Sequence, residues 1–142
     1  MKNYKLAFLL ILIPCLTFGQ ANEKHPLDIQ RENCFDISEN QTTYGMINCE
    51  RESANLWDKQ LNEYYQILMK HLKKSEQKSL RAAQKKWIEY RDEELKFYGQ
   101  FYNNMDGTMW PLIAANRRYE VIKTRALELK EYIDNLLEPG KG

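Results

Sequence analysis

Apolar residues recur at steps of three and four along three stretches of the chain, which is the spacing of one face of an α-helix. The first stretch predicts a helix that begins at Thr42 or Thr43, either of which can cap it, and that ends near Lys74. Its apolar stripe consists of Trp57, Leu61, Tyr64, Tyr65, Leu68 and Leu72. Because residues 46–98 contain neither Gly nor Pro, long helices are permitted throughout this part of the chain.

Two further helices are predicted, separated by a polar loop at residues 103–107. Ser75 is the expected N-cap of the second helix. The stripe of that helix consists of Leu80, Ala83, Trp87, Tyr90, Phe97 and Phe101, and Ile88, Leu95 and Tyr98 widen the apolar face. The third helix is expected to follow Thr108, with Pro111 in its first turns, where a missing N–H does least harm. Its stripe consists of Leu112, Ala115, Tyr119, Ile122, Ala126, Leu129, Ile133 and Leu136.

These patterns predict an all-α fold without a strand. Residues 42–138 are expected to form a three-helix antiparallel bundle whose first two helices make a long hairpin. Residues 21–41 are polar, contain Pro26 and show no sustained period, so an irregular N-terminal arm is expected there.

Residues 1–20 are typical of a signal peptide rather than of a folded domain. Lys2 and Lys5 precede an unbroken apolar run, and residues 17–19 supply the small-x-small spacing that a signal peptidase reads. Cleavage is expected after Gly19 or Gln20, which predicts an exported protein, periplasmic or secreted.

Two alternatives for this segment are disfavoured. A transmembrane anchor needs roughly 20 apolar residues, whereas the stretch here covers residues 6–18. A lipid anchor on Cys15 normally requires a small residue just before the cysteine, and Pro14 stands there instead. No membrane span is therefore expected after cleavage.

The net charge limits the classes of binding partner, and the cysteine content indicates a disulfide. Without residues 1–20 the chain has 122 residues, 19 basic and 20 acidic, so its net charge is −1. This balance argues against nucleic acid and against an electrostatic membrane binder. Cys34 and Cys49 are an even pair in an exported protein, which predicts a disulfide that pins the N-terminal arm. The alternatives are two free thiols or half a zinc site, and neither His25 nor His71 has a ligand-like spacing to them.

The residues that carry enzyme chemistry do not form a recognisable motif. The sequence contains no glycine-rich phosphate loop, no His-Glu-x-x-His and no Cys-x-x-Cys. Carboxylate pairs such as Glu50 and Glu52 could take part in acid–base chemistry, but charge runs on helices are usually solvated faces. We therefore expect a binding protein without a metal or other cofactor, not an enzyme.

One set of residues is more specific than a helical pattern. The set comprises Cys49, Leu61-Asn62 with Tyr65, the segment Ala83-Gln84-Lys85-Lys86-Trp87-Ile88-Glu89-Tyr90-Arg91-Asp92, Gly107-Thr108, and Arg125 with Leu129. In this order it resembles the LprI-type lysozyme inhibitor family, small exported or lipid-anchored bacterial proteins, over residues 34–133. A second cysteine pair common in that family is missing, at Leu95 and about Arg117. The resemblance implies inhibition of lysozyme.

The family-signature residues are interpreted as structural. They are Asn62, Tyr65, Gln84, Trp87, Tyr90, Arg91, Asp92 and Arg125. Trp87 and Tyr90 are expected in the core, because aromatic residues at helical spacing usually pack there. The polar members would tie helices together through hydrogen bonds or a carboxylate fork to Arg125. The alternative is a polar–aromatic patch that binds a partner, since Tyr, Trp and Arg are frequent hot spots.

The loop before the third helix is the favoured partner-binding element. Tyr102, Asn103, Asn104 and Trp110 could stack and hydrogen-bond in the concave cleft of a glycosidase. The leading hypothesis is therefore an exported inhibitor of a lysozyme-type muramidase. The alternative is an envelope interaction or scaffold protein that binds another cell-envelope protein and has no enzyme target.

Overall fold

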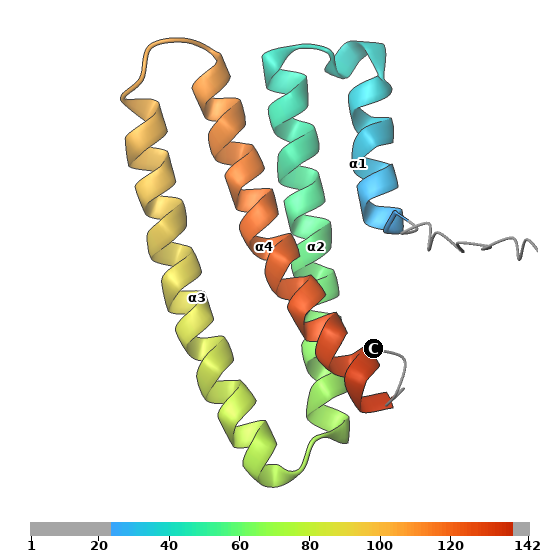
Figure 1. Cartoon of the computed structure of the whole chain (residues 1–142). Helices are drawn as coiled ribbons and strands as arrows, with labels where there is room; N and C mark the ends of the chain where they lie inside the picture. The colour runs from blue at the N-terminus through green and yellow to red at the C-terminus, as the bar shows by residue number, and fades with distance from the viewer. Residues whose placement is uncertain (1–23, 138–142) are drawn as a thin grey trace, which may run out of the picture.

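The computed structural model describes residues 24–137, and every regular element in that range is helical (Figure 1). The elements are α1 (Pro26–Asp36), the short 3₁₀ helix η1 (Ser38–Asn40), α2 (Thr43–His71), α3 (Lys74–Asn103) and α4 (Met109–Leu137). The all-α prediction is confirmed for this part of the chain, but it holds four α-helices rather than three. The signal peptide expected at residues 1–20 lies outside the described residues, as does Glu138 at the end of the expected domain.

The additional helix is α1, which replaces most of the arm that was expected to be irregular. Pro26 is the first helical residue, and the Nδ1 atom of His25 accepts the Leu27 N–H at 3.2 Å. A proline at this position has no hydrogen bond to lose. No residue of α1 is buried. The helix therefore lacks the apolar face by which a surface helix is normally detected in a sequence.

Helix α2 begins where the sequence predicts it. Thr42 is its N-cap, and the Thr42 hydroxyl oxygen accepts the N–H of Gly45 at 3.0 Å. Gly45 is buried under η1, and a Cβ atom there would lie 2.5 Å from the Cα of Asn40. A residue with a side chain would push η1 away from α2. The helix ends at His71, slightly before the expected Lys74.

The turn between α2 and α3 lies about three residues earlier than predicted. Helix α3 begins at Lys74, with Lys73 rather than Ser75 as its N-cap. The Glu76 carboxylate accepts the Lys73 N–H at 2.8 Å, and the side-chain amide of Gln77 donates to the carbonyls of Met69 and Leu72, each at 2.9 Å. Side chains of α3 thus bind backbone groups that the helix ends leave unpaired.

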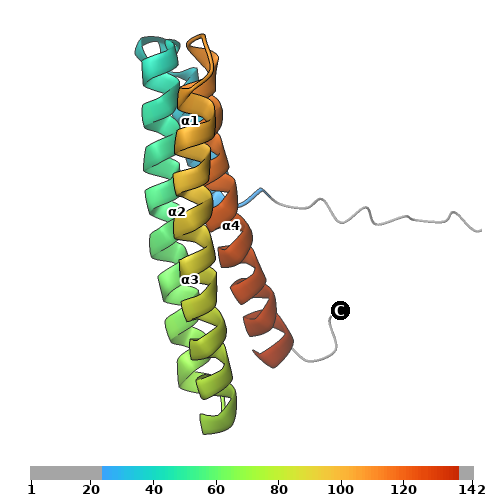
Figure 2. The same cartoon turned by 90° about the vertical axis from the view of Figure 1, so that its left-hand side faces the viewer.

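The core lies mainly between α2 and α4, which make the most extensive helix contact in the molecule. Its buried residues are Ala54, Trp57, Leu61, Leu68, Tyr119, Ile122, Ala126 and Leu129. The stripes predicted on the first and third helices are confirmed at these positions, whereas Leu136 is 41% exposed. Figures 1 and 2 show α4 inclined to both α2 and α3. The two hairpin helices diverge, and α4 takes the place that α3 was expected to hold against α2.

Helix α3 turns inward only part of the predicted face, namely Leu80 and Trp87 with Leu95 and Tyr98. Its inward residues, fully or partly buried, are Gln77, Leu80, Gln84, Trp87, Arg91, Leu95, Tyr98 and Tyr102. Of the predicted stripe, Ala83, Tyr90, Phe97 and Phe101 are exposed, so the expectation that Tyr90 is core is wrong. Helix α3 packs against α4 and hardly against α2. Its apolar residues therefore cover a wider arc of the helix than the arc that α4 contacts.

Among residues 24–137, none of the helices is both long enough and apolar enough to span a membrane.

Candidate protein-binding surface

The end of the molecule formed by α3 and α4 carries a preformed aromatic loop. The rings of Tyr102 and Trp110 stack with centroids 5.9 Å apart, across the turn that joins the two helices. The Trp110 indole N–H donates to the carbonyl of Asp106 at 2.9 Å, and Gly107 has a φ of 115°. A left-handed residue of this kind favours glycine. The stack and the hydrogen bond tie the loop to its own flanking residues.

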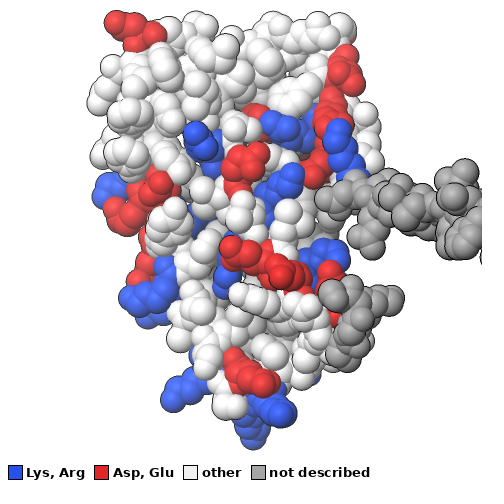
Figure 3. Space-filling view, in the orientation of Figure 1, with Lys and Arg blue, Asp and Glu red and all other residues white. Residues whose placement is uncertain are grey.

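The four residues predicted to bind a partner are brought together at this end. Asn103 and Asn104 are exposed, while Tyr102 and Trp110 are half-buried because each covers the other. The aromatic cluster continues down α3 through Phe101 and Phe97, whose rings stack at 5.5 Å. Figure 3 shows few charged side chains over this end of the molecule. The loop therefore offers amide groups beside an uncharged aromatic support.

The signature residues Gln84 and Arg125 join α3 to α4. Gln84 is 7% exposed, and its Oε1 atom accepts a hydrogen bond from the Nε of Arg125 at 3.1 Å. Arg125 also reaches Glu128 at 2.8 Å within α4. The fork that was expected between Arg125 and Asp92 is absent, because Asp92 is exposed on α3 and binds its neighbour Arg91.

Asn62, Tyr65 and Arg91 lie where α3 faces α2, whereas the signature residues Tyr90 and Asp92 are exposed on α3. Arg91 lies over the ring of Trp87 and approaches the Asp58 carboxylate of α2 at 3.4 Å. Asn62 donates to the carbonyl of Asp58 at 2.8 Å. An open groove of about 410 Å³ lies here, lined by Asn62, Tyr65, Arg81, Gln84, Lys85, Ile88 and Glu89. Arg91 thus joins α3 to α2, whereas the bond of Asn62 to Asp58 lies within α2.

A polar network that the sequence analysis missed holds α1 on α2 and α4. Asp28 accepts hydrogen bonds from the Tyr119 hydroxyl at 2.6 Å and from Lys123 at 2.8 Å. Beside it, the His25 ring packs on Trp57 with centroids 4.4 Å apart. These contacts join residues that are far apart in sequence, and no spacing within α1 could have revealed them.

A second ion pair lies closer to the disulfide. The Arg31 guanidinium grips the Glu50 carboxylate with two hydrogen bonds, and Asn116 of α4 donates to the same carboxylate at 3.2 Å. Glu50 is 3% exposed. A signal for it existed in the sequence, because Glu50 continues the stripe of Ala54 and Trp57 toward the start of α2. A charged residue on an inward stripe is expected to be paired.

The surroundings of this network shift several pKa values. Burial raises the pKa of Tyr119 to about 12, and its hydrogen bond to Asp28 acts in the same direction. Burial opposes the charge on Asp28, but the hydrogen bonds from Lys123 and Tyr119 outweigh it and lower its pKa. Likewise, the bonds of Lys123 raise its pKa in spite of burial. Burial lowers the pKa of His25, which favours its neutral form.

The predicted disulfide between Cys34 and Cys49 is present and joins α1 to α2. It encloses η1 and the start of α2, so it fixes the end of α1 nearest the α3–α4 loop (Figure 1). Across residues 24–137, no group of three or more His, Cys, Asp or Glu side chains is arranged to hold a metal ion.

The profile of the LprI family, described as "Lysozyme inhibitor LprI", matches residues 34–129. The chain belongs to this family. The match begins at the disulfide cysteine Cys34 and ends at Leu129 in the core of α4, so it includes the signature residues and the α3–α4 loop. The resemblance noted in the sequence is thereby confirmed.

A solved structure shares this LprI fold. The crystal structure of an uncharacterized protein from Burkholderia thailandensis superposes with a TM-score of 0.78 at 26% sequence identity. The match covers 82% of this chain and 57% of the other, so this chain spans little more than half the length of its structural neighbour. No curated protein matches the chain.

Proposed function

We propose that this LprI-family protein is exported and inhibits a lysozyme-type muramidase by inserting its α3–α4 loop into the enzyme's substrate cleft. The family match over residues 34–129 carries the proposal, because the family is described as a lysozyme inhibitor family. The inhibitor binds its target and catalyses no reaction. The signal-like residues 1–20 and the disulfide support export, since such bonds persist in oxidising compartments.

The loop suits this role because its own contacts order it and because its two asparagines stand beside uncharged rings, with Asp106 as the one acidic residue among residues 103–108. Binding costs less free energy when the binding element is already ordered, and the Tyr102–Trp110 stack provides that order. Asn103 and Asn104 can offer amide donors and acceptors in place of the N-acetyl and hydroxyl groups of a glycan. Without residues 1–20 the net charge is −1, which gives little long-range attraction to a basic lysozyme, so short-range fit at the loop must supply the specificity.

A turbidity assay on bacterial cell walls tests the proposal. Oxidised protein comprising residues 21–142 is titrated against several lysozyme classes, and inhibition of at least one class should saturate near one inhibitor per enzyme. The variant Asn103→Ala with Asn104→Ala should weaken inhibition roughly tenfold or more, as loss of interface hot spots does. Asn48→Ala, an exposed asparagine on α2, is the matched control and should not change it.

The variant Trp110→Ala tests whether the shape of the loop matters for inhibition in addition to the two asparagine side chains. It removes the stack on Tyr102 without touching the core, and it should weaken inhibition while circular dichroism stays helical. Full inhibition by both loop variants would exclude the loop as the binding element. Absence of inhibition for every lysozyme class would favour an envelope interaction protein.

A further inference from the structure

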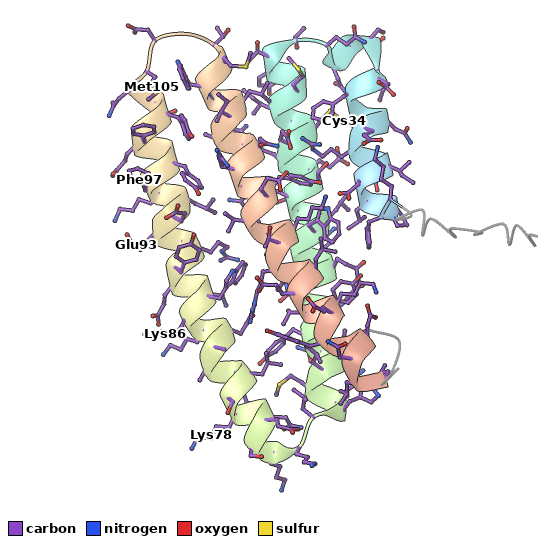
Figure 4. The ribbon with its side chains drawn as sticks, viewed as in Figure 1. Cys34, Lys78, Lys86, Glu93, Phe97 and Met105 are labelled. Carbon is purple, nitrogen blue, oxygen red and sulfur yellow. A yellow bond between two sulfur atoms is a disulfide. The ribbon has the colours of Figure 1, made fainter. Side chains whose placement is uncertain are left out.

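Helix α3 has an exposed stripe that none of the other helices covers. We name it the outer stripe; it consists of Ser79, Ala83, Lys86, Tyr90, Glu93, Phe97 and Phe101, all of them exposed. Most lie one residue before an inward position of α3, which places the stripe about 100° around the helix from the contact with α4. Figure 4 shows Lys86, Glu93 and Phe97 on the edge of α3 that faces away from the other helices.

The outer stripe is asymmetric about Tyr90 in both size and charge. Toward the start of α3 it carries the small residues Ser79 and Ala83 and the basic Lys86. Toward the end it carries the acidic Glu93 and two large rings, Phe97 and Phe101. A surface that is small and basic at one end and large and acidic at the other is complementary to itself when turned around.

We propose that two copies of this chain pair along the outer stripe, with their α3 helices antiparallel and Tyr90 on the two-fold axis. In this register Phe97 of one copy is level with Ala83 of the other, and Phe101 is level with Ser79. Rings then fill the spaces above small residues, as knobs enter holes in paired helices. Lys86 comes level with Glu94 of the other copy and adjacent to its Glu93, which gives one set of ion pairs on each side of the axis.

The opposite, parallel arrangement has neither advantage. It would place Lys86 against Lys86 and Glu93 against Glu93, and like charges at such spacing repel. It would also set the phenylalanine rings against each other while leaving the small residues uncovered. In the single molecule, Lys86 and Glu93 bind only exposed partners of their own helix, Glu89 and Lys96. These pairs are worth little and can be exchanged for contacts between copies.

The area available sets the expected strength. Tyr90, Phe97 and Phe101 expose 54%, 53% and 45% of their surfaces. Together they offer roughly 300 Å², whereas a stable interface buries about 800 Å² on each partner. The remainder can come from the adjoining groove of about 290 Å³ between α3 and α4, which Trp87 and Tyr98 line from α3 and Thr124 lines from α4. We therefore expect a weak dimer, with a dissociation constant in the micromolar range.

Sedimentation equilibrium at increasing protein concentration tests the pairing through charge. The parent protein should pass from monomer to dimer. Lys86→Glu and Glu93→Lys should each shift the midpoint to higher concentration, because each places like charges opposite one another. Mixing the two single variants should restore association, since each then supplies the charge that the other lacks. Lys59→Glu, an exposed lysine on α2, is the control and should leave association unchanged.

Two further variants test the register and the rings. Phe97→Ser should raise the dissociation constant about tenfold or more, while Tyr44→Ser, a more exposed aromatic residue outside the stripe, should not. Under mild oxidation, the variant Tyr90→Cys should form a disulfide between position 90 of one copy and position 90 of the other, because both lie on the two-fold axis. Tyr44→Cys should not.

A monomer at every concentration, or a dimer that Phe97→Ser and the charge variants leave intact, would overturn the proposal. It would also fail if the protein stayed monomeric and Phe97→Ser abolished lysozyme inhibition, because the stripe would then belong to the enzyme interface. The loop variants Asn103→Ala and Asn104→Ala lie outside the stripe and should not affect association. Failure of the pairing and failure of the inhibitor hypothesis are thus separate outcomes.

Discussion

The guanidinium of Arg125 donates a hydrogen bond to the amide oxygen of Gln84, and this contact between α4 and α3 is buried although its partners are polar. Gln84 is the one residue of α3 that is buried. The helix that completes the bundle is therefore located by a specific hydrogen bond as well as by apolar packing. Such a bond contributes modestly while it is intact, but a buried donor without a partner costs more.

Replacing Gln84 with Ala should destabilise the protein by about 1–3 kcal/mol, because the Nε atom of Arg125 loses its acceptor while the other bond of Arg125, to Glu128, stays. The double variant with Arg125→Ala should cost less than the two single losses combined, and urea denaturation of all four proteins measures this coupling. Additive losses would show that the two side chains do not depend on each other.

Replacing Glu50 with Ala should lower the free energy of unfolding by about 3 kcal/mol, since Arg31 and Asn116 lose a buried carboxylate. Glu52→Ala on the same helix is the matched control, because Glu52 is exposed, and its effect should stay within about 0.5 kcal/mol. Denaturation curves that coincide for the two variants would contradict this account of α1.

Adding one methyl group to α2 and one to α3 should have opposite effects. Gly45→Ala should destabilise by about 1–3 kcal/mol, because its Cβ atom would meet the backbone of Asn40. Gly99→Ala has open space around its Cβ atom and should stabilise α3 by about 0.5–1 kcal/mol. Thermal unfolding of the two variants checks the signs.

Loss of the disulfide should cost about 3 kcal/mol for a loop of this length. In the variant Cys34→Ser with Cys49→Ser, amide hydrogens of α1 should exchange faster than in the parent, because α1 has no fully buried residue and packs on the core through the half-buried Leu27. The amides of α2 and α4 near Trp57 and Ile122 should keep more of their protection. Equal acceleration throughout the chain would mean that α1 is not a separable element.

Stability should be nearly constant between about pH 6.5 and 10 and should fall on both sides. On the acid side, the unfolded chain protonates His25 near its ordinary pKa of 6.5, above the lowered folded value, so stability declines as the pH falls. Asp28 extends the decline below 3.8, as the pH approaches its lowered folded pKa. On the alkaline side, Tyr119 ionises near 10.0 when unfolded but near 12 when folded, so stability is lost as the pH rises.

Melting temperatures across this range test the assignment. Tyr119→Phe should remove much of the alkaline decline and leave the decline near pH 6.5 in place, because His25 still titrates. An unchanged alkaline limb in that variant would show that Tyr119 is not its source. Tyr98, whose pKa burial also raises to about 12, and Lys123, whose pKa is raised by its bonds to Asp28 and Tyr119, should account for the decline that remains.

Much of the fold could be predicted because the spacing of apolar residues along each segment already indicates which face of its helix is buried. The start of α2, the buried positions of α4 and the Cys34–Cys49 pair follow from spacing, capping residues and cysteine count. Of the binding residues, the grouping of Tyr102, Asn103, Asn104 and Trp110 in one turn was visible in the sequence as a polar loop between two helices. Their stack was not, because it depends on how closely α3 and α4 approach.

The sequence by itself determined the helical class, the main core stripes, the disulfide and the family. Only the tertiary structure decided that Pro26–Asp36 is a helix, that Gln84 rather than Tyr90 faces inward, and that Glu50 is paired with Arg31. Helical periodicity limits which residues share a face, but it does not say how many faces find a partner. The number of partners depends on contacts between distant segments. Here α3 packs mainly against α4, although its apolar arc is wide enough to pack against two helices.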